Sequence, residues 1–413
     1  MNEFEFINIM EKKKKEHILF VKNLKYRDIY YEIKKNLKKQ KNMFIFYGLR
    51  GIGKSTSLYQ ILKDYDAMFI DGTILDYYNL ELVETVNEYI KHNKTKILIL
   101  DEITDLKDWS KALKVLYDNY DLNIIATGSS AIGISTKNKE IVRRALIKEI
   151  QPLSFKEYLR LKYDKLFDIS TRDIFLSNPQ DAYVKAKSIF LKIPDLSKEF
   201  NEYLKFGFPL SFERPIEYTS ESILSKIIID DFPGISGFNI EVSNIAKGII
   251  NILALSSPDS ISLSKFSNSL DCSKTTVSNI LNAFILSSLL IPVLSDKTSS
   301  AKIRKEPKYL FSSPAIRYGF AKKLVETPNI GLLREDFFVS SFKYAGFTVE
   351  YLTGLKKHAD YLIKFKDKNA IIEVGGPSKE IDQLKKGFLL IDDNKIDYKD
   401  EIVILPLYFV GFL

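Results

Sequence analysis

The feature that most constrains the fold is a glycine-rich segment, residues 48–55, directly after a short apolar run. The run, residues 43–47, is too short for a helix and predicts a buried strand. The segment fits the pattern G-x-x-x-x-G-K-[ST], in which glycines let the backbone curl so that successive N–H groups point inward at an anion. A helix expected to begin near Lys54 adds its positive dipole end. The sequence therefore predicts a phosphate-binding loop between a strand and a helix.

The residues expected to contact a nucleotide lie together in this loop and at the start of the helix: Gly48, Leu49, Arg50, Gly51, Ile52, Gly53, Lys54, Ser55 and Thr56. Lys54 is expected to bridge the β- and γ-phosphates, and Ser55 to offer its hydroxyl to Mg²⁺, which takes few protein ligands. ATP and Mg²⁺ are the expected cofactors. The alternative is a glycine-rich turn that only caps a helix. That alternative does not explain why the strand, the lysine and the hydroxyl all stand at the positions that the motif requires.

A second apolar run, residues 97–100, ends in the acidic pair Asp101 and Glu102. Open α/β sheets bind ligands at the carboxyl ends of their strands, which is where these carboxylates emerge. Asp101 is expected to hold the magnesium through water, and Glu102 to activate the water that attacks the γ-phosphate. The alternative is a solvated strand end, which is common for an isolated acidic pair but less so downstream of a phosphate loop.

Two further residues are candidates for catalysis. Thr127 ends the apolar run 123–126, a strand expected to lie between the two previous ones, where a polar side chain senses the γ-phosphate or orients water. The alternative there is a strand-to-helix turn with a serine as N-cap. Arg144 is a candidate finger that places a guanidinium on the γ-phosphate of a neighbouring subunit, and an exposed basic pair with Arg143 is its alternative.

Short apolar runs recur along the first part of the chain, at residues 43–47, 67–70, 97–100, 123–126 and 145–150. Helical or loop-like segments separate them, and this alternation predicts an α/β fold with a parallel sheet covered by helices on both faces. We expect this ATPase core to span residues 26–150, after a charged and weakly periodic N-terminal arm over residues 1–25.

The middle of the chain is mostly helical. Residues 151–257 predict a helical lid or connector, with breaks at prolines and glycines. Residues 258–325 have the spacing of a winged helix-turn-helix, whose second helix would present its polar face to double-stranded DNA: Lys274, Thr275, Thr276, Ser278 and Asn279, with Lys297, Lys302, Arg304 and Lys305 in the wing. That helix has one lysine and no arginine, so the alternative is a module that packs on protein.

Sequence landmarks run in one order along nearly the whole chain: residues 47–55, 98–103, Trp109, 116–118, 127–130, 151–159, 203–209, 307–311 and 335–337. On these landmarks the chain resembles archaeal and bacterial AAA+-type ATPases that join a P-loop ATPase to a winged helix and a C-terminal nuclease-like domain of unknown function. The resemblance implies a P-loop NTPase sheet of the ASCE/AAA+ type and ATP hydrolysis, and Thr127 is similar to the sensor position of such ATPases.

The last segment, residues 326–413, resembles restriction-type nucleases through an acidic set: Glu335, Asp360 and Glu373. Such a set holds one or two metal ions so that water can attack a phosphate. The lysine expected two residues after Glu373 is replaced by Gly375, and His358 stands where an acid is common. We therefore expect a degenerate domain that does not cut, unless Lys379 substitutes for the missing lysine.

Composition excludes several classes of protein. An apolar fraction of 45% excludes wholesale disorder, and the single Cys272 excludes an intramolecular disulfide and a cysteine-built zinc site. The uncharged stretch 275–295 has polar residues and helical spacing, which predicts a half-buried helix and no membrane span.

No basic start leads into an apolar signal core, so the cytoplasm is the expected location. The histidines, His17, His92 and His358, form no ligand cluster and are expected at the surface.

These patterns together predict a magnesium-dependent ATPase whose nucleotide state acts on a DNA- or protein-binding C-terminal half. The net charge of +8 permits a polyanionic partner without requiring one. Expected partners besides ATP are double-stranded DNA, another protein or a second copy of the chain. Two alternatives remain open: a slow nucleotide-dependent switch that acts on proteins, and a DNA nuclease regulated by ATP.

Overall fold

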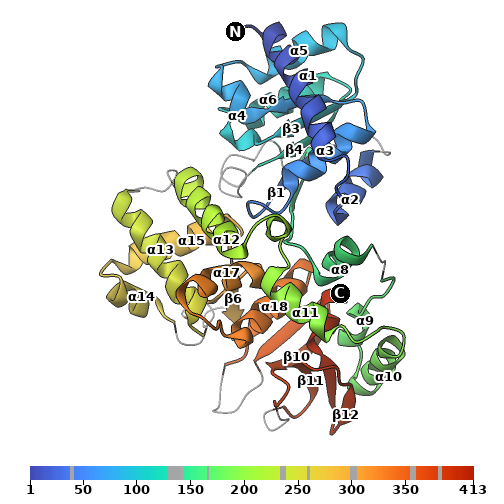
Figure 1. The fold of residues 1–413 in the computed structure, drawn as a ribbon, viewed down its shortest axis with the longest axis vertical. Coiled ribbons are helices and arrows are strands. Elements are labelled where there is room, and N and C mark those ends of the chain that lie inside the picture. Colours follow the sequence, from blue (N-terminus) through green and yellow to red (C-terminus); the bar gives the residue numbers. More distant parts are fainter. Residues whose placement is uncertain are drawn as a thin grey trace. The chain divides into compact units, whose positions relative to one another are not determined.

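A computed structural model describes residues 1–37, 41–128, 141, 143–164, 167–232, 239–257, 261–297, 305–353, 360–379 and 384–413. The chain divides into two compact units. Unit 1 consists of Met1–Gln151 with Leu286–Ser288, and unit 2 of Pro152–Ile285 with Leu289–Leu413. Figure 1 shows the chain coloured from blue to red along the sequence.

Unit 1 is an α/β structure in which helices surround a sheet (Figure 1). Its elements are α1 (Glu3–Phe20), α2 (Asp28–Leu37), β1 (Met43–Tyr47), α3 (Lys54–Asp64), β2 (Met68–Asp71), α4 (Gly72–Tyr77), α5 (Leu82–His92), β3 (Ile97–Asp101), a 3₁₀ turn (Ile103–Asp105), α6 (Trp109–Asn119), β4 (Asn123–Thr127) and β5 (Ala145–Glu149).

The strands that the structure describes in unit 1 are all parallel and form a sheet of order β2-β3-β4-β1-β5. The strands predicted from the apolar runs match them within a residue or two, and β4 lies between β3 and β1 as expected. The central residues, among them Ile45, Ile99 and Ile125, are fully buried, because both faces of a parallel sheet are covered by helices. This arrangement fits a P-loop NTPase fold.

Residues 1–25 do not form an arm, which corrects the expectation from the sequence. Most of them form α1, which begins with Asn2 as N-cap in a capping box with Glu5 and packs against α3, α5 and β2. Phe6 and Met10, one turn apart, are buried in unit 1. The run of four lysines led us to expect an exposed arm in place of this helix. In the structure one of them, Lys14, donates a hydrogen bond of 2.6 Å to the Ala67 carbonyl.

Unit 2 contains helices packed on one large sheet. Its elements are α8 (Phe155–Tyr163), α9 (Arg172–Phe175), α10 (Pro179–Phe190), α11 (Ser197–Phe206), a 3₁₀ turn (Pro209–Phe212), α12 (Ile216–Lys226), a π turn (Ile227–Asp231), α13 (Ile240–Leu255), α14 (Leu263–Ser269), α15 (Lys274–Leu286), β6 (Leu290–Ser295), β7 (Lys308–Phe311), α17 (Pro314–Leu324), α18 (Ile330–Tyr344), β8 (Thr348–Tyr351), β9 (Tyr361–Phe365), β10 (Lys368–Gly375), β11 (Gly387–Ile391), β12 (Asp397–Lys399), β13 (Ile402–Pro406) and a 3₁₀ helix (Leu407–Phe412).

The helices α8 to α11, expected to be part of a lid over residues 151–257, instead share a hydrophobic core with the C-terminal segment. Phe200 of α11 meets Phe337 of α18 with ring centroids 4.8 Å apart, and Phe155 of α8 meets Phe412 at 5.8 Å. All four rings are buried. Helices that carry their own apolar face into a common core are part of that fold, so these four belong to the C-terminal structure.

The two helices and the strand expected between residues 262 and 293 are present as α14, α15 and β6, and the Ser273 hydroxyl accepts the Thr276 amide at 3.0 Å, as expected of an N-cap. The strand β6 pairs antiparallel with β7 and parallel with β8, within a sheet of order β12-β13-β11-β10-β9-β8-β6-β7. The predicted division at residue 325 therefore does not separate two sheets. Lys302 and Arg304 of the expected wing, and His358, lie outside the described residues.

The uncharged stretch near residue 275 is the amphipathic helix α15, with Val277, Ile280, Leu281 and Phe284 buried. Within the described ranges, no helix has both the length and the apolar character that a bilayer crossing requires.

A truncation in α11 tests whether these helices belong to the C-terminal core. Phe200→Ala removes a fully buried ring and should lower the free energy of unfolding by about 3–5 kcal/mol in urea titrations followed by circular dichroism. Phe206→Ala on the same helix, where the ring is 41% exposed, is the matched control and should cost far less. Equal effects of the two substitutions would contradict a shared core.

Candidate functional site

The predicted phosphate loop has the backbone that its glycines allow. Gly48, Gly51 and Gly53 have φ of 147°, 76° and 89°, a region that favours glycine. Gly48 also admits no side chain, because a Cβ there would lie 2.6 Å from the Ile150 carbonyl oxygen. The loop therefore needs glycine at these positions, and it leads directly into α3, for which Gly53 is the N-cap.

Lys54, the first residue of α3, is 6% exposed and turns its ammonium back over the loop. Its Nζ donates to the carbonyl oxygens of Gly48 at 2.8 Å and Leu49 at 3.3 Å. A buried ammonium that faces the concave side of a backbone loop is placed to meet an anion there.

Sequence reasoning missed Arg27, which contacts the backbone of the phosphate loop. Its guanidinium donates to the carbonyls of Ile52 and Gln151, and its Cδ would contact a Cβ at Gly53 at 3.4 Å. No local pattern marks Arg27, because its partners lie 25 and 124 residues away along the chain.

The side chains predicted for the metal and catalytic site converge on Asp101. The Ser55 hydroxyl donates to Asp101 Oδ1 at 3.0 Å, and the Thr127 hydroxyl donates to the same oxygen at 2.5 Å. Thr127 also accepts the Glu102 amide at 3.3 Å, so it links both acidic residues. Tyr59, which the sequence patterns did not single out, donates to Asp101 Oδ2 at 3.1 Å. Ser129 and Ser130, the alternative N-caps after Thr127, lie outside the described residues.

Glu102 occupies an unusual position for an acidic residue. Its backbone is left-handed, with φ of 52°, and its Oε2 is buried with no hydrogen-bond partner in the part of the chain that the structure describes. Burial raises the pKa of Glu102; the positive charge of Lys54 opposes this shift, and the charge of Asp101 adds to it. A buried carboxylate with one oxygen that accepts no hydrogen bond from the described residues, and with a raised pKa, has the properties of a general base.

Magnesium fits the donor set at this site. Ser55 and Asp101 offer the hard oxygen ligands that Mg²⁺ prefers, and their side-chain oxygens already lie together. Over the described ranges, no three His, Cys, Asp or Glu side chains gather as a metal cage. A cage is not needed here, because Mg²⁺ at nucleotide sites keeps several waters and takes only one or two protein ligands.

The remaining predicted residues of unit 1 are placed as follows. Arg144 forms a bidentate pair with Asp118 at 2.8 and 2.9 Å, within unit 1 and away from Asp101 in the sheet order, so its role as a finger stays a prediction. His17 is not a plain surface residue as expected, since its ring stacks on Tyr59 at 3.9 Å. His92 is exposed beside Glu88, as expected.

On α15, the side chains proposed for DNA contact are accessible to different degrees. Lys274, Thr275 and Asn279 are exposed, and Thr276 and Ser278 are half-buried. Exposure is compatible with either a DNA groove or a protein surface as the partner.

The C-terminal acidic residues lie close together in unit 2. Asp360 directly precedes β9 and Glu373 lies on the adjacent antiparallel strand β10, where Tyr361 is opposite Ile372. Tyr361 donates to Glu335 Oε2 at 2.8 Å, and the Val374 amide donates to Asp360 Oδ2 at 2.9 Å. The three carboxylates are near enough for the charges of Glu335 and Glu373 to act on Asp360, but within the described ranges they do not gather closely enough to form a metal-binding group.

Lys379 reaches into this acidic group. Its Nζ lies 2.8 Å from Glu373 Oε1, and its side chain passes over Gly375 so closely that a Cβ there would lie 2.5 Å from it. Glu373 is fully buried, and its Oε2 has no hydrogen-bond partner within the described ranges. The aliphatic part of Lys379 thus fills the space beside Gly375, and its ammonium pairs with the carboxylate of Glu373.

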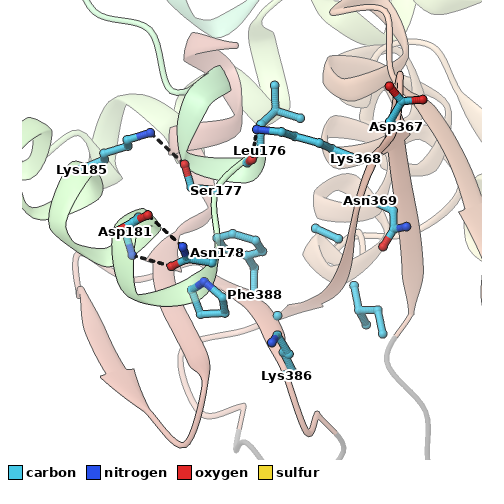
Figure 2. A pocket seen from close by; sticks show the side chains of 14 residues that line it. Leu176, Ser177, Asn178, Asp181, Lys185, Asp367, Lys368, Asn369, Lys386 and Phe388 are labelled. Carbon is cyan, nitrogen blue, oxygen red and sulfur yellow. Dashed lines mark hydrogen bonds between the residues drawn. The ribbon is translucent and has the colours of Figure 1, made fainter.

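A separate pocket of about 730 Å³ lies in unit 2 between the α9–α10 segment and the β9–β10 hairpin (Figure 2). Two of its lysines have neighbouring partners: Lys185 donates to the Ser177 hydroxyl and Lys368 to the Leu176 carbonyl. None of the residues predicted for a site lines this pocket, and we assign it no chemistry.

Comparison with known proteins supports the description of unit 1. Residues 40–159 match the family model described as an AAA domain. The chain is 28% identical over 411 residues to an uncharacterized protein of Methanocaldococcus jannaschii, covering 91% of this chain and 85% of the relative. It is 25% identical over 253 residues to an uncharacterized protein of Haemophilus influenzae, covering 57% and 56%.

Among solved structures, the Walker-type ATPase of Pyrococcus abyssi is similar with a TM-score of 0.43 at 14% identity, covering 72% of this chain and 98% of that one. A RuvB variant of Thermotoga maritima gives a TM-score of 0.30 at 16% identity, covering 73% and 95%. The AAA-domain match spans β1, the phosphate loop, β3 and β4, which together carry the site described above.

The raised pKa of Asp360 gives a test of the C-terminal acidic group. Burial is the main cause that raises this pKa to about 6, and the charges of Glu335 and Glu373 add to it. A pKa that is higher in the folded chain than in the unfolded chain stabilises the fold at low pH, and this stability is lost as pH rises through about 6.

Asp360→Asn cannot ionise, so in chelator it should be more stable than the native protein at pH 8, by about 1–2 kcal/mol, with the difference vanishing near pH 4. Urea unfolding at a series of pH values measures this. The exposed Asp367→Asn is the control and should show no such pH-dependent gain. A gain that is the same at both pH values would show that the pKa of Asp360 is not raised in the folded chain and that its carboxyl is not buried.

Proposed function

We propose that this protein binds ATP with Mg²⁺ and hydrolyses it to ADP and phosphate, and that nucleotide state acts on a DNA- or protein-binding C-terminal half. The observation that carries the proposal is the convergence of Ser55 and Thr127 on Asp101, at the end of the strand that also carries Glu102. A fold that only capped a helix with glycines would not need hydroxyl and carboxylate groups from three elements to meet beside the loop.

In this proposal each side chain has one task. Lys54 exchanges its carbonyl partners for phosphate oxygens, which are stronger acceptors because they are charged. Ser55 and Asp101 hold the magnesium ion, which when bound neutralises charge on the phosphates. Glu102 takes a proton from the attacking water, and Thr127 keeps the two acidic residues in place through its hydroxyl.

The proposal is tested by two measurements on the native protein and two variants: the rate of phosphate release and the affinity for nucleotide in a binding titration. Glu102→Gln should keep nucleotide affinity and lose at least about 100-fold in rate, because it removes the base but not the phosphate contacts. Lys54→Ala should lose about 10- to 100-fold in nucleotide affinity, because it removes a charge-assisted contact. Lys63→Ala, at an exposed position of the same helix α3, is the control for the second variant.

The same assay separates hydrolysis from a slow switch and DNA from protein partners. If the native protein binds nucleotide tightly but releases no phosphate, and Glu102→Gln changes nothing, the switch replaces the ATPase. If double-stranded DNA does not stimulate hydrolysis and no salt-dependent binding is seen, α15 serves a protein partner.

A second candidate function is metal-dependent DNA cleavage, and the position of Lys379 favours it. The expectation of a degenerate nuclease rested on the glycine at position 375, whereas the Lys379 ammonium lies 2.8 Å from Glu373. In such sites, carboxylates hold the metal ion and a lysine stabilises charge at the phosphate.

Incubation of plasmid DNA with the native protein and Mg²⁺ or Mn²⁺ tests this second candidate. Nicked or linear products should form, and both Asp360→Ala and Lys379→Ala should abolish them. Lys386→Ala changes a lysine that faces Glu401 instead and should cut like the native protein. If the native protein cuts no DNA with either metal, the domain is degenerate.

A further inference from the structure

We propose that Tyr59 is a positioning residue that holds the metal-binding carboxylate of Asp101 in place, and that the His17 ring of α1 holds Tyr59. The proposal rests on the function proposed above and adds to it two residues outside the phosphate-loop and acidic-pair motifs. It also gives α1, which the sequence indicated as an arm, a part in the metal site.

The first support is that one face of α3 donates hydrogen bonds to both oxygens of the Asp101 carboxylate. Ser55 and Tyr59 are four residues apart on α3, so their side chains lie on the same face one turn apart. Ser55 donates to Oδ1 at 3.0 Å and Tyr59 to Oδ2 at 3.1 Å. Thr127 adds a second donor on Oδ1. With Tyr59 removed, Oδ2 loses this donor and the carboxylate can rotate about the Oδ1 contacts.

The second support is the aromatic packing that fixes Tyr59. The His17 ring lies parallel to the Tyr59 ring, with centroids 3.9 Å apart and planes 4° apart. Phe69 of β2 meets both rings edge-on, at 5.3 Å from His17 and 5.9 Å from Tyr59. A ring held on one face and at one edge keeps its rotamer, so its hydroxyl stays directed at Asp101.

Tyr59 is suited to act as a constant donor. Burial and the neighbouring Asp101 raise the pKa of its phenol, so it keeps its proton through the physiological range. Burial is also the largest cause that lowers the pKa of His17, which favours a neutral ring in the stack. Hydrogen bonds to metal-binding carboxylates orient them, and losing one commonly costs about 10- to 100-fold in metal affinity or activity.

The test separates a role at the metal from a role in the fold, and it does not depend on hydrolysis. The affinity for a fluorescent ADP analogue is measured by titration in Mg²⁺ and in EDTA, and the ratio gives the gain in affinity due to magnesium. Tyr59→Phe keeps the ring and removes only the hydroxyl. In EDTA it should bind the analogue with the affinity of the native protein. The ratio of its affinity in Mg²⁺ to that in EDTA should be about tenfold smaller than the ratio for the native protein.

Tyr89→Phe is the matched control. Tyr89, on α5, also joins α1, through a hydrogen bond of 3.4 Å to Glu11, but has no contact with Asp101 among those described. It should keep the full gain from magnesium. His17→Ala should lose part of this gain, and His17→Phe, which restores a flat ring for the stack, should recover it.

The outcomes are distinct. If the native protein binds no nucleotide under either condition, the proposed function fails, and the role of Tyr59 with it. If the native protein binds with a gain from magnesium and Tyr59→Phe has the same gain, the positioning role is wrong. If Tyr59→Phe weakens binding equally in EDTA and in Mg²⁺, the hydroxyl supports the fold and not the metal site, which also overturns the inference.

Discussion

The hydrogen bonding of the Asp101 carboxylate is the interaction on which the site of unit 1 depends. Its donors come from α3 and from β4, and Asp101 itself ends β3. A carboxylate that is 4% exposed needs such donors on both oxygens, since an unsatisfied buried charge is costly. Because α3 also begins at the phosphate loop, these bonds fix the loop and the acidic pair in one geometry.

Much of unit 1 could be predicted because its signals are local. The glycines of the phosphate loop need positive φ at particular positions, and the apolar runs of β1 and β3 are too short for any other buried element. The meeting of Ser55, Asp101 and Thr127 followed from the strand order, which the alternating pattern constrains. Each of these inferences used residues that are close in sequence or joined by one parallel pairing.

The residues that sequence reasoning missed or misplaced all depend on distant partners. His17 stacks on a residue 42 positions away, and Arg27 donates to the carbonyl of Gln151. The helices α8 to α11 were expected to form part of a lid. Their periodicity indicates that each has an apolar face, but it does not indicate which surface that face packs against. Packing partners of this kind are set by the whole fold, so no local pattern reveals them.

The strand β6 has two different neighbours, the antiparallel β7 and the parallel β8. It therefore belongs both to the segment with the helix-turn-helix spacing and to the segment with the acidic group. A chain ending near residue 325 would deprive β6 of β8 and leave its backbone groups open to another chain, as exposed sheet edges commonly are. Because the pairing of β6 with β8 joins these two segments, one sheet runs through both, and neither segment has its complete sheet without the other.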